Sequence, residues 1–140
     1  MYYPDLTPYT FCEWDPDFDD QIPAPALNVG WLDYFHRFPK WKAAPPPEFL
    51  NNLFELCFEL RMPMQGFHRC QLCWFSPLWF SPFALSVSRN GKELMLGSAE
   101  IRVSGTGNKV YAAPNLIYHY VEKHRYKPPE DFIKAVLSIC

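Results

Sequence analysis

The sequence lacks the features that mark secreted and membrane proteins. No apolar run approaches the ~18 residues that a membrane span requires. The first ten residues, MYYPDLTPYT, contain neither the basic nor the apolar segment found in signal peptides. The five cysteines are an odd number, which fits free thiols or metal ligands better than a disulfide framework. We therefore expect a cytoplasmic protein that does not bind membranes.

The common catalytic motifs are also missing. The chain contains no P-loop and no G-x-G-x-x-G, G-x-S-x-G or H-E-x-x-H segment. These absences exclude the most recognisable nucleotide-dependent enzymes, serine hydrolases and zinc proteases. The sequence assigns no catalytic residue and favours a non-enzymatic role.

Positive charge is absent from the first part of the chain. Residues 1–36 hold seven acidic residues and no lysine or arginine, a net charge of −7, whereas the rest holds 13 basic and 8 acidic residues, a net charge of +5. Four of the acids lie close together, at Asp15, Asp17, Asp19 and Asp20. Two interpretations are open: the acidic arm folds over the basic body, or it presents a negative face to a partner.

Aromatic residues and proline are abundant. Aromatics make up 18% of the 140 residues and there are 15 prolines, within a composition that is 49% hydrophobic and 20% charged. This balance is typical of a globular chain that can bury a sizeable core, and the length predicts a single domain over 1–140. Because prolines interrupt residues 1–25, we predict an irregular, extended acidic arm there and an α+β body over 26–140.

Three helices are predicted in the body. Residues 46–60 begin with prolines and a glutamate and repeat apolar residues at helical spacing. Residues 114–126 form a second helix opened by Pro114, and 127–140 a third that starts at Pro128 or Pro129. The first and third of these helices both begin with prolines followed by acidic residues. Such starts are common in helices, so we do not interpret the likeness as a duplication within the chain.

The strands are predicted from alternating apolar residues. The segment ALNVGWL, residues 26–32, predicts a short strand. Asn90-Gly91 between two strand-like runs predicts a type I′ hairpin. With the alternation that follows, over 99–103 and 110–111, it predicts a small antiparallel sheet, a β-meander of three or four strands, packed by two or three helices.

Two cysteines and two histidines carry the chemical signal of the sequence. Cys70 and Cys73 have the C-x2-C spacing of zinc knuckles. After 45 intervening residues, His119 and His124 have a spacing used by the histidine half of such sites. On a regular helix a spacing of five separates two side chains by about 140°. Both histidines could therefore bind one ion only if the last helical turn tightens or frays. His68 is a fallback ligand.

Two further interpretations of the cysteines stay open. Cys70 and Cys73 could be small apolar residues of an aromatic-rich core, with His124 a core or helix-end histidine. They could also be a redox pair, although no strand precedes them with a helix beginning at the pair, as that chemistry requires.

Two surfaces are predicted to bind a partner. The duplicated WFSP segments contribute Trp74 and Trp79, which form either an aromatic loop on the core or an exposed apolar patch. The acidic arm contributes the other surface. Nucleic acid is a less favoured partner because the isoelectric point is about 6.0. The residues that would contact a nucleic acid are Arg69, Arg89, Lys92, Arg102, Lys109, Lys123, Arg125 and Lys127.

Two segments, GFHRCQLC and LGSAEIRVSGTGNKVYAAPNLIYHYVEKHRYKPPEDFIKAV, resemble an uncharacterised bacterial family. Its members carry a G-[FY]-H-x-C-x-x-C segment and a later Y-x-A-P-x-L-I-x-H-Y segment followed by Y-x-P-P. The resemblance implies that residues 65–73 and 111–133 belong to one unit, and it attaches no activity.

Taken together, the residues favour a cytosolic interaction protein of the accessory or immunity type with a structural zinc site. A zinc-containing nucleic-acid-binding module and a small metal-dependent enzyme with one open coordination position are the alternatives.

Overall fold

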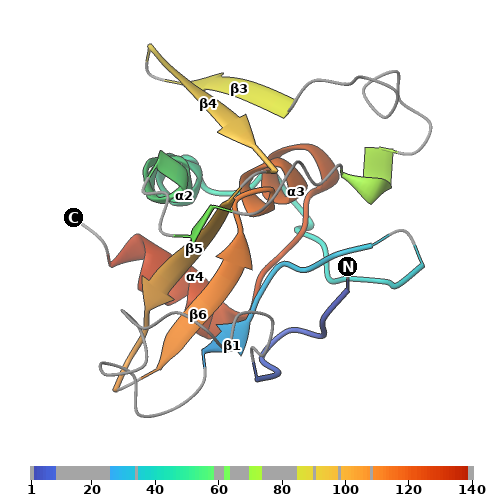
Figure 1. Ribbon diagram of the computed structural model, residues 1–140, viewed down its shortest axis with the longest axis vertical. Coiled ribbons are helices and arrows are strands. Elements are labelled where there is room, and N and C mark those ends of the chain that lie inside the picture. The colour runs from blue at the N-terminus through green and yellow to red at the C-terminus, as the bar shows by residue number, and fades with distance from the viewer. Residues whose placement is uncertain are drawn as a thin grey trace.

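The chain folds into helices packed on small sheets, which confirms the predicted α+β class (Figure 1). This computed structural model describes residues 2–8, 26–33, 35–58, 62–63, 70–73, 85–89, 91–97, 99–107 and 109–138. Within these residues, no helix is long and apolar enough to cross a membrane.

The main sheet has the strand order β1-β6-β5-β2. Its centre is the antiparallel pair of β5, Ala99–Ser104, and β6, Val110–Pro114. On one side β1, Leu27–Asn28, runs parallel to β6, and on the other side β2, Met62–Pro63, runs antiparallel to β5. The observed β1 is much shorter than the strand predicted over 26–32. Gly30, with a φ of +78°, turns the chain soon after it.

The predicted meander is divided between two sheets. β3, Leu85–Arg89, and β4, Lys92–Leu96, pair only with each other across the predicted two-residue hairpin loop, and they stand off from the main sheet (Figure 1). Gly97, with a φ of +94°, turns the chain after β4, and its N–H donates to Asn115 Oδ1 over 2.7 Å. Because Asn115 also donates to the carbonyl of Met95, this one side chain holds the turn that separates the two sheets.

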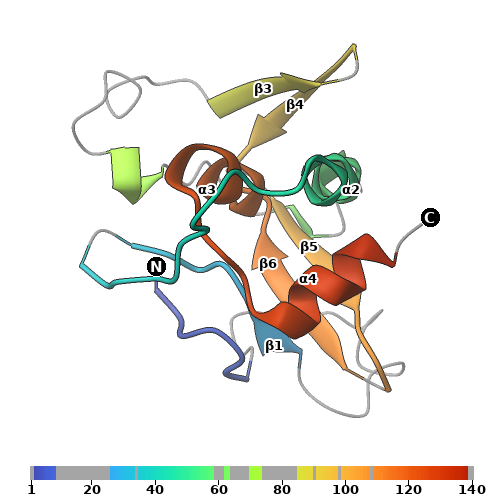
Figure 2. The same cartoon turned by 180° about the vertical axis from the view of Figure 1, so that it is seen from behind.

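Three helices surround the sheet in the described part of the chain. α2, Pro47–Phe58, begins at a proline as predicted, and Glu48 lies in its first turn. α3, Ile117–His124, starts later than predicted because Pro114 is the last residue of β6. α4, Glu130–Leu137, crosses one face of the sheet, as Figure 2 shows, and its Phe132 ring packs edge-on against Tyr111.

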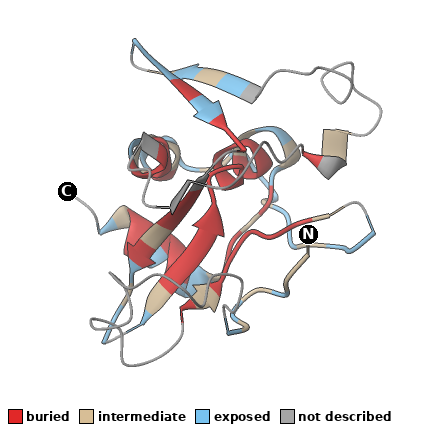
Figure 3. Ribbon diagram, in the orientation of Figure 1, coloured by how far each residue is buried: buried red, intermediate tan, exposed pale blue. Residues whose placement is uncertain are grey.

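The core lies between the sheet and these helices. Figure 3 shows its buried residues concentrated on β6, α3 and the inner faces of α2 and α4. The largest completely buried side chains are Tyr111, Tyr118, Tyr126, Phe49, Phe54 and Phe132. The aromatic content of the sequence is thus used mainly for packing.

Residues 2–8 lie along the segment around β1. Backbone N–H groups of Tyr3 and Leu6 donate to the carbonyls of Trp31 and Asn28, and Asn28 donates back to Thr7. The first residues of the predicted arm are therefore bonded to the body. Asp15, Asp17, Asp19 and Asp20 lie outside the described residues.

Candidate metal centre

A tight turn presents the two cysteines. Gln71–Cys73 form a single 3-10 turn, and the backbone N–H of Cys73 donates to the carbonyl of Cys70 over 3.1 Å. Leu72, between the cysteines, packs against the core. Cys70 is buried and Cys73 is half-buried, so the turn lies at the edge of the core rather than on the open surface.

The two histidines come from α3. His119 is buried, with 3% exposure, and His124 is the last helical residue. Despite the five-residue spacing, their Nε2 atoms lie 3.2 Å apart. The sequence predicted that this requires an irregular helix end, and the helix does end there: Arg125 takes a left-handed conformation with a φ of 59°.

The end of α3 is wider than a regular helical turn. The carbonyl of Tyr120 accepts the backbone N–H groups of both Arg125 and Tyr126, five and six residues later. A regular α-helix uses a spacing of four. A wider turn rotates the chain less per residue, which helps His124 to reach the side on which His119 lies. The turn therefore widens rather than tightening.

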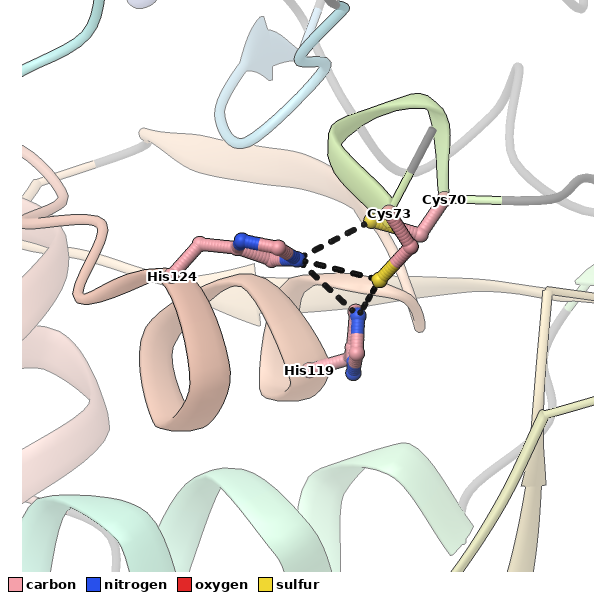
Figure 4. A group of neighbouring side chains, drawn as sticks. All are labelled: Cys70, Cys73, His119 and His124. Carbon is pink, nitrogen blue, oxygen red and sulfur yellow. Dashed lines mark hydrogen bonds between the residues drawn. The ribbon is translucent and has the colours of Figure 1, made fainter. Parts of the chain in front are cut away.

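The four side chains point their ligand atoms at one another, as Figure 4 shows. Cys73 Sγ lies 3.1 Å from His119 Nε2 and 3.3 Å from His124 Nε2. Cys70 Sγ lies 3.4 Å from His124 Nε2. All four ligand atoms lie within 4.8 Å of one another. Four ligand atoms are the number that a four-coordinate metal ion binds.

These separations match the size of a tetrahedral zinc site. Zinc–sulfur bonds of about 2.3 Å and zinc–nitrogen bonds of about 2.0–2.1 Å give ligand separations of roughly 3.4 Å between nitrogens and 3.6 Å between nitrogen and sulfur. Four of the six observed separations, at 3.1–3.4 Å, are shorter by a few tenths of an ångström. The other two, from Cys70 to Cys73 and to His119, lie within 4.8 Å. Two sulfurs and two nitrogens are also the donor set that structural zinc prefers.

Burial favours the neutral forms of Cys70, His119 and His124. Burial, and then the neighbouring Cys73, raise the pKa of the Cys70 thiol to about 12. Burial, followed by His124 and Lys123, lowers the pKa of His119 to about 4. The pKa of His124 is lowered as well, by burial and then by Lys40. A bound cation would supply the charge that stabilises the thiolates in this setting.

The arrangement does not suit the redox interpretation. A reactive C-x-x-C pair needs a lowered thiol pKa, which a helix N-terminus or a nearby cation provides. Here Cys70 directly precedes the 3-10 turn that ends at Cys73, and the pKa of Cys70 is raised. Cys57, the other cysteine within the described residues, is fully buried on α2, 3.6 Å from the Asn115 carbonyl oxygen, and takes no part in the centre.

The structure thus brings together Cys70, Cys73, His119 and His124, which were predicted as one site from the spacing within each pair, although 45 residues separate the two pairs. The fallback ligand His68 and the predicted partner-binding residues Trp74 and Trp79 lie outside the described residues.

Sequence reasoning missed two polar residues that position the centre. Tyr126, two residues after His124, donates its hydroxyl to Asp5 Oδ2 over 2.7 Å, and Asp5 Oδ1 accepts the Gly30 N–H over 3.1 Å. This joins the chain after α3 to the N-terminal segment. Asn115 holds the start of α3 against the turn after β4. No local pattern marks such contacts, because their partners are distant in sequence.

Comparison with known proteins identifies a family but no activity. No curated protein and no solved structure matches the chain. A family model described as "Domain of unknown function (DUF7919)" matches residues 1–137, nearly the whole chain. This fits the expectation of an uncharacterised family. The chain belongs to the DUF7919 family.

Proposed function

We propose that this protein is a non-enzymatic interaction protein whose fold is held by one structural zinc ion. The observation that carries the proposal is the convergence of four zinc-type donor atoms, from Cys70, Cys73, His119 and His124, within 4.8 Å. The ion would join the turn of residues 70–73 to the end of α3, two segments separated by 45 residues of sequence.

A closed ligand set favours a structural role over catalysis. Catalytic zinc sites use three protein ligands and keep the fourth position for water or substrate, whereas structural sites use four. In this centre four protein side chains would supply the tetrahedron, which would leave no position for a substrate. This supports the structural interpretation over a small metal-dependent enzyme.

Pairing within the chain weighs against a nucleic-acid role for three of the eight predicted basic contacts. Arg89 donates to Asn51 and to the Tyr118 hydroxyl. Lys92 contacts Glu55, and Arg102 contacts Glu100. Cations that already have partners in the chain have less to gain from phosphate.

The proposal is tested by X-ray absorption at the zinc edge on chain loaded with zinc. We expect a first shell of two sulfurs at about 2.3 Å and two nitrogens at about 2.0–2.1 Å. A shell containing an oxygen donor from water would contradict the closed site and favour the catalytic alternative. Failure to load zinc would contradict the metal assignment itself.

A further inference from the structure

Exposed cationic side chains gather on two neighbouring segments next to the metal centre. The backbone N–H of Trp41 donates to the carbonyl of Arg125 over 2.8 Å, and that of Lys127 to Pro39 over 2.9 Å, so segment 37–42 runs beside segment 123–127. We call the exposed cations of these two segments the basic face. They are Arg37, Lys40, Lys42, Lys123 and Arg125.

The basic face has little carboxylate of its own. None of its five cations forms an ion pair within the described residues, and the adjacent Lys127 is paired with Glu130 at 3.2 Å. The exposed carboxylates of the described chain belong to α2, β4 and α4. They are Glu48, Glu55, Glu93, Glu130 and Asp131. The charge on the face is therefore available to a partner.

The helix dipole explains only part of this surface. Lys123 and Arg125 lie at the C-terminal end of α3, where positive charge is favourable. Arg37, Lys40 and Lys42 belong to a connecting loop rather than to the helix, although Lys40 lies close enough to the helix end to lower the pKa of His124. Phe35, at the start of the same loop, is 83% exposed and adds apolar surface beside the charges. Figure 3 shows this loop largely in the colour of exposed residues.

We propose that the basic face binds an acidic segment of a partner protein. The inference rests on the proposed interaction function and deepens it by naming the chemistry of the partner. Carboxylates would pair with the lysine and arginine groups, and an apolar side chain next to them would contact Phe35. Such charge complementarity mainly raises the rate and the specificity of association.

A short acidic peptide suits this face better than a nucleic acid. Outside the basic face, Arg89 and Lys92 are already paired within the chain. Arg102 and Lys127 are paired as well. A long polyanion that extends beyond the basic face would therefore find fewer unpaired cations to contact, whereas a segment no longer than the face needs none.

The test is fluorescence anisotropy with the zinc-loaded full chain and two labelled probes at one salt concentration. One probe is a short peptide of alternating glutamate and leucine, and the other is single-stranded DNA of matched charge. The test variant carries Lys40→Glu and Arg125→Glu. The control carries Lys109→Glu and Lys134→Glu, which make the same change of charge on exposed lysines outside the basic face.

We expect the peptide to bind the wild type, the test variant to weaken it on the order of tenfold, and the control to leave it nearly unchanged. No peptide binding, equal weakening by both variants, or tighter binding of DNA than of peptide would overturn the proposal. Zinc content is measured on the same samples. Wild-type chain without zinc would contradict the metal assignment. The peptide result would still test, separately, whether the basic face binds an acidic segment.

Discussion

At the scale of single residues, Cys73 is the cysteine that contacts both histidines of the metal centre, with its sulfur 3.1 and 3.3 Å from their nitrogens. Cys57 is equally a thiol, and it is more deeply buried, but it lies on α2 among apolar side chains. Cys57 belongs to the apolar core on α2, whereas Cys73 belongs to the C-x2-C knuckle that the sequence predicted. The two cysteines therefore differ in their surroundings but not in their side chain, so Cys57 is a suitable control for Cys73.

Substituting these two cysteines should separate metal binding from packing. Cys73→Ser should lose the metal and lower the free energy of unfolding by about 3 kcal/mol or more, because binding of a structural metal is coupled to folding. Cys57→Ala should keep full metal content and cost about 1 kcal/mol through lost packing. Metal analysis and urea unfolding of both variants provide the measurement. Equal metal content in the two variants would contradict the assignment.

Asp5 should make the free energy of unfolding depend on pH, independently of any metal. Burial raises its pKa above 3.8, although Tyr126 and Gly30 donate hydrogen bonds to it. In the pH range between the unfolded and the folded pKa, folding therefore takes up a proton, and stability falls as pH rises through the folded value. Relative to Asp5→Asn, the wild type should lose unfolding free energy from about pH 4 upward.

Urea unfolding of both chains across this pH range tests that expectation. The difference between the two chains cancels the contribution of the metal centre, which both carry. A difference that is constant with pH, or that grows in favour of the wild type as pH rises, would show that Asp5 is not a buried carboxyl with a raised pKa.

Among the elements, the close approach of the loop after β1 to α3 determines how the centre is supported. Gly30 has a φ of +78°, and a Cβ atom there would lie 2.8 Å from Cδ1 of Ile117, the first residue of α3. Its N–H also donates to Asp5. The N-terminal segment, β1 and α3 therefore meet at one backbone position that only glycine fits.

Gly30→Ala should destabilise the protein more than Gly91→Ala. Gly91 has nearly the same φ, +76°, but nothing lies within 4 Å of an added Cβ. Gly91→Ala should therefore cost only the strain of the left-handed conformation, on the order of 1 kcal/mol. Gly30→Ala should add the clash with Ile117, a cost of about 1–3 kcal/mol more. Thermal unfolding of both variants measures the difference, and equal losses would contradict the close contact.

For the whole molecule, the sequence predicted the class of fold and the four residues of the centre better than it predicted connectivity. The start of α2 and the hairpin at Asn90-Gly91 follow from local residue preferences, and both are found. The spacing of Cys70, Cys73, His119 and His124 follows from ligand chemistry, and the structure brings these side chains together.

What the sequence could not predict depends on contacts between distant residues. The division of the expected meander depends on Asn115, which bonds both Gly97 and Met95. The parallel pairing of β1 with β6 joins residues more than 80 positions apart. The late start of α3 was missed because Pro114, a residue that often opens helices, here ends a strand. In each case tertiary contacts override a local preference.

The measurement that tests the central claim most directly is the zinc content per chain of the natively purified protein, compared with that of Cys70→Ser. We expect about one zinc ion per wild-type chain and none in Cys70→Ser, because the remaining three ligands do not close the site. A wild-type chain that purifies without metal and gains no stability when zinc is added would contradict the account, since Cys70, Cys73, His119 and His124 would then be packing residues.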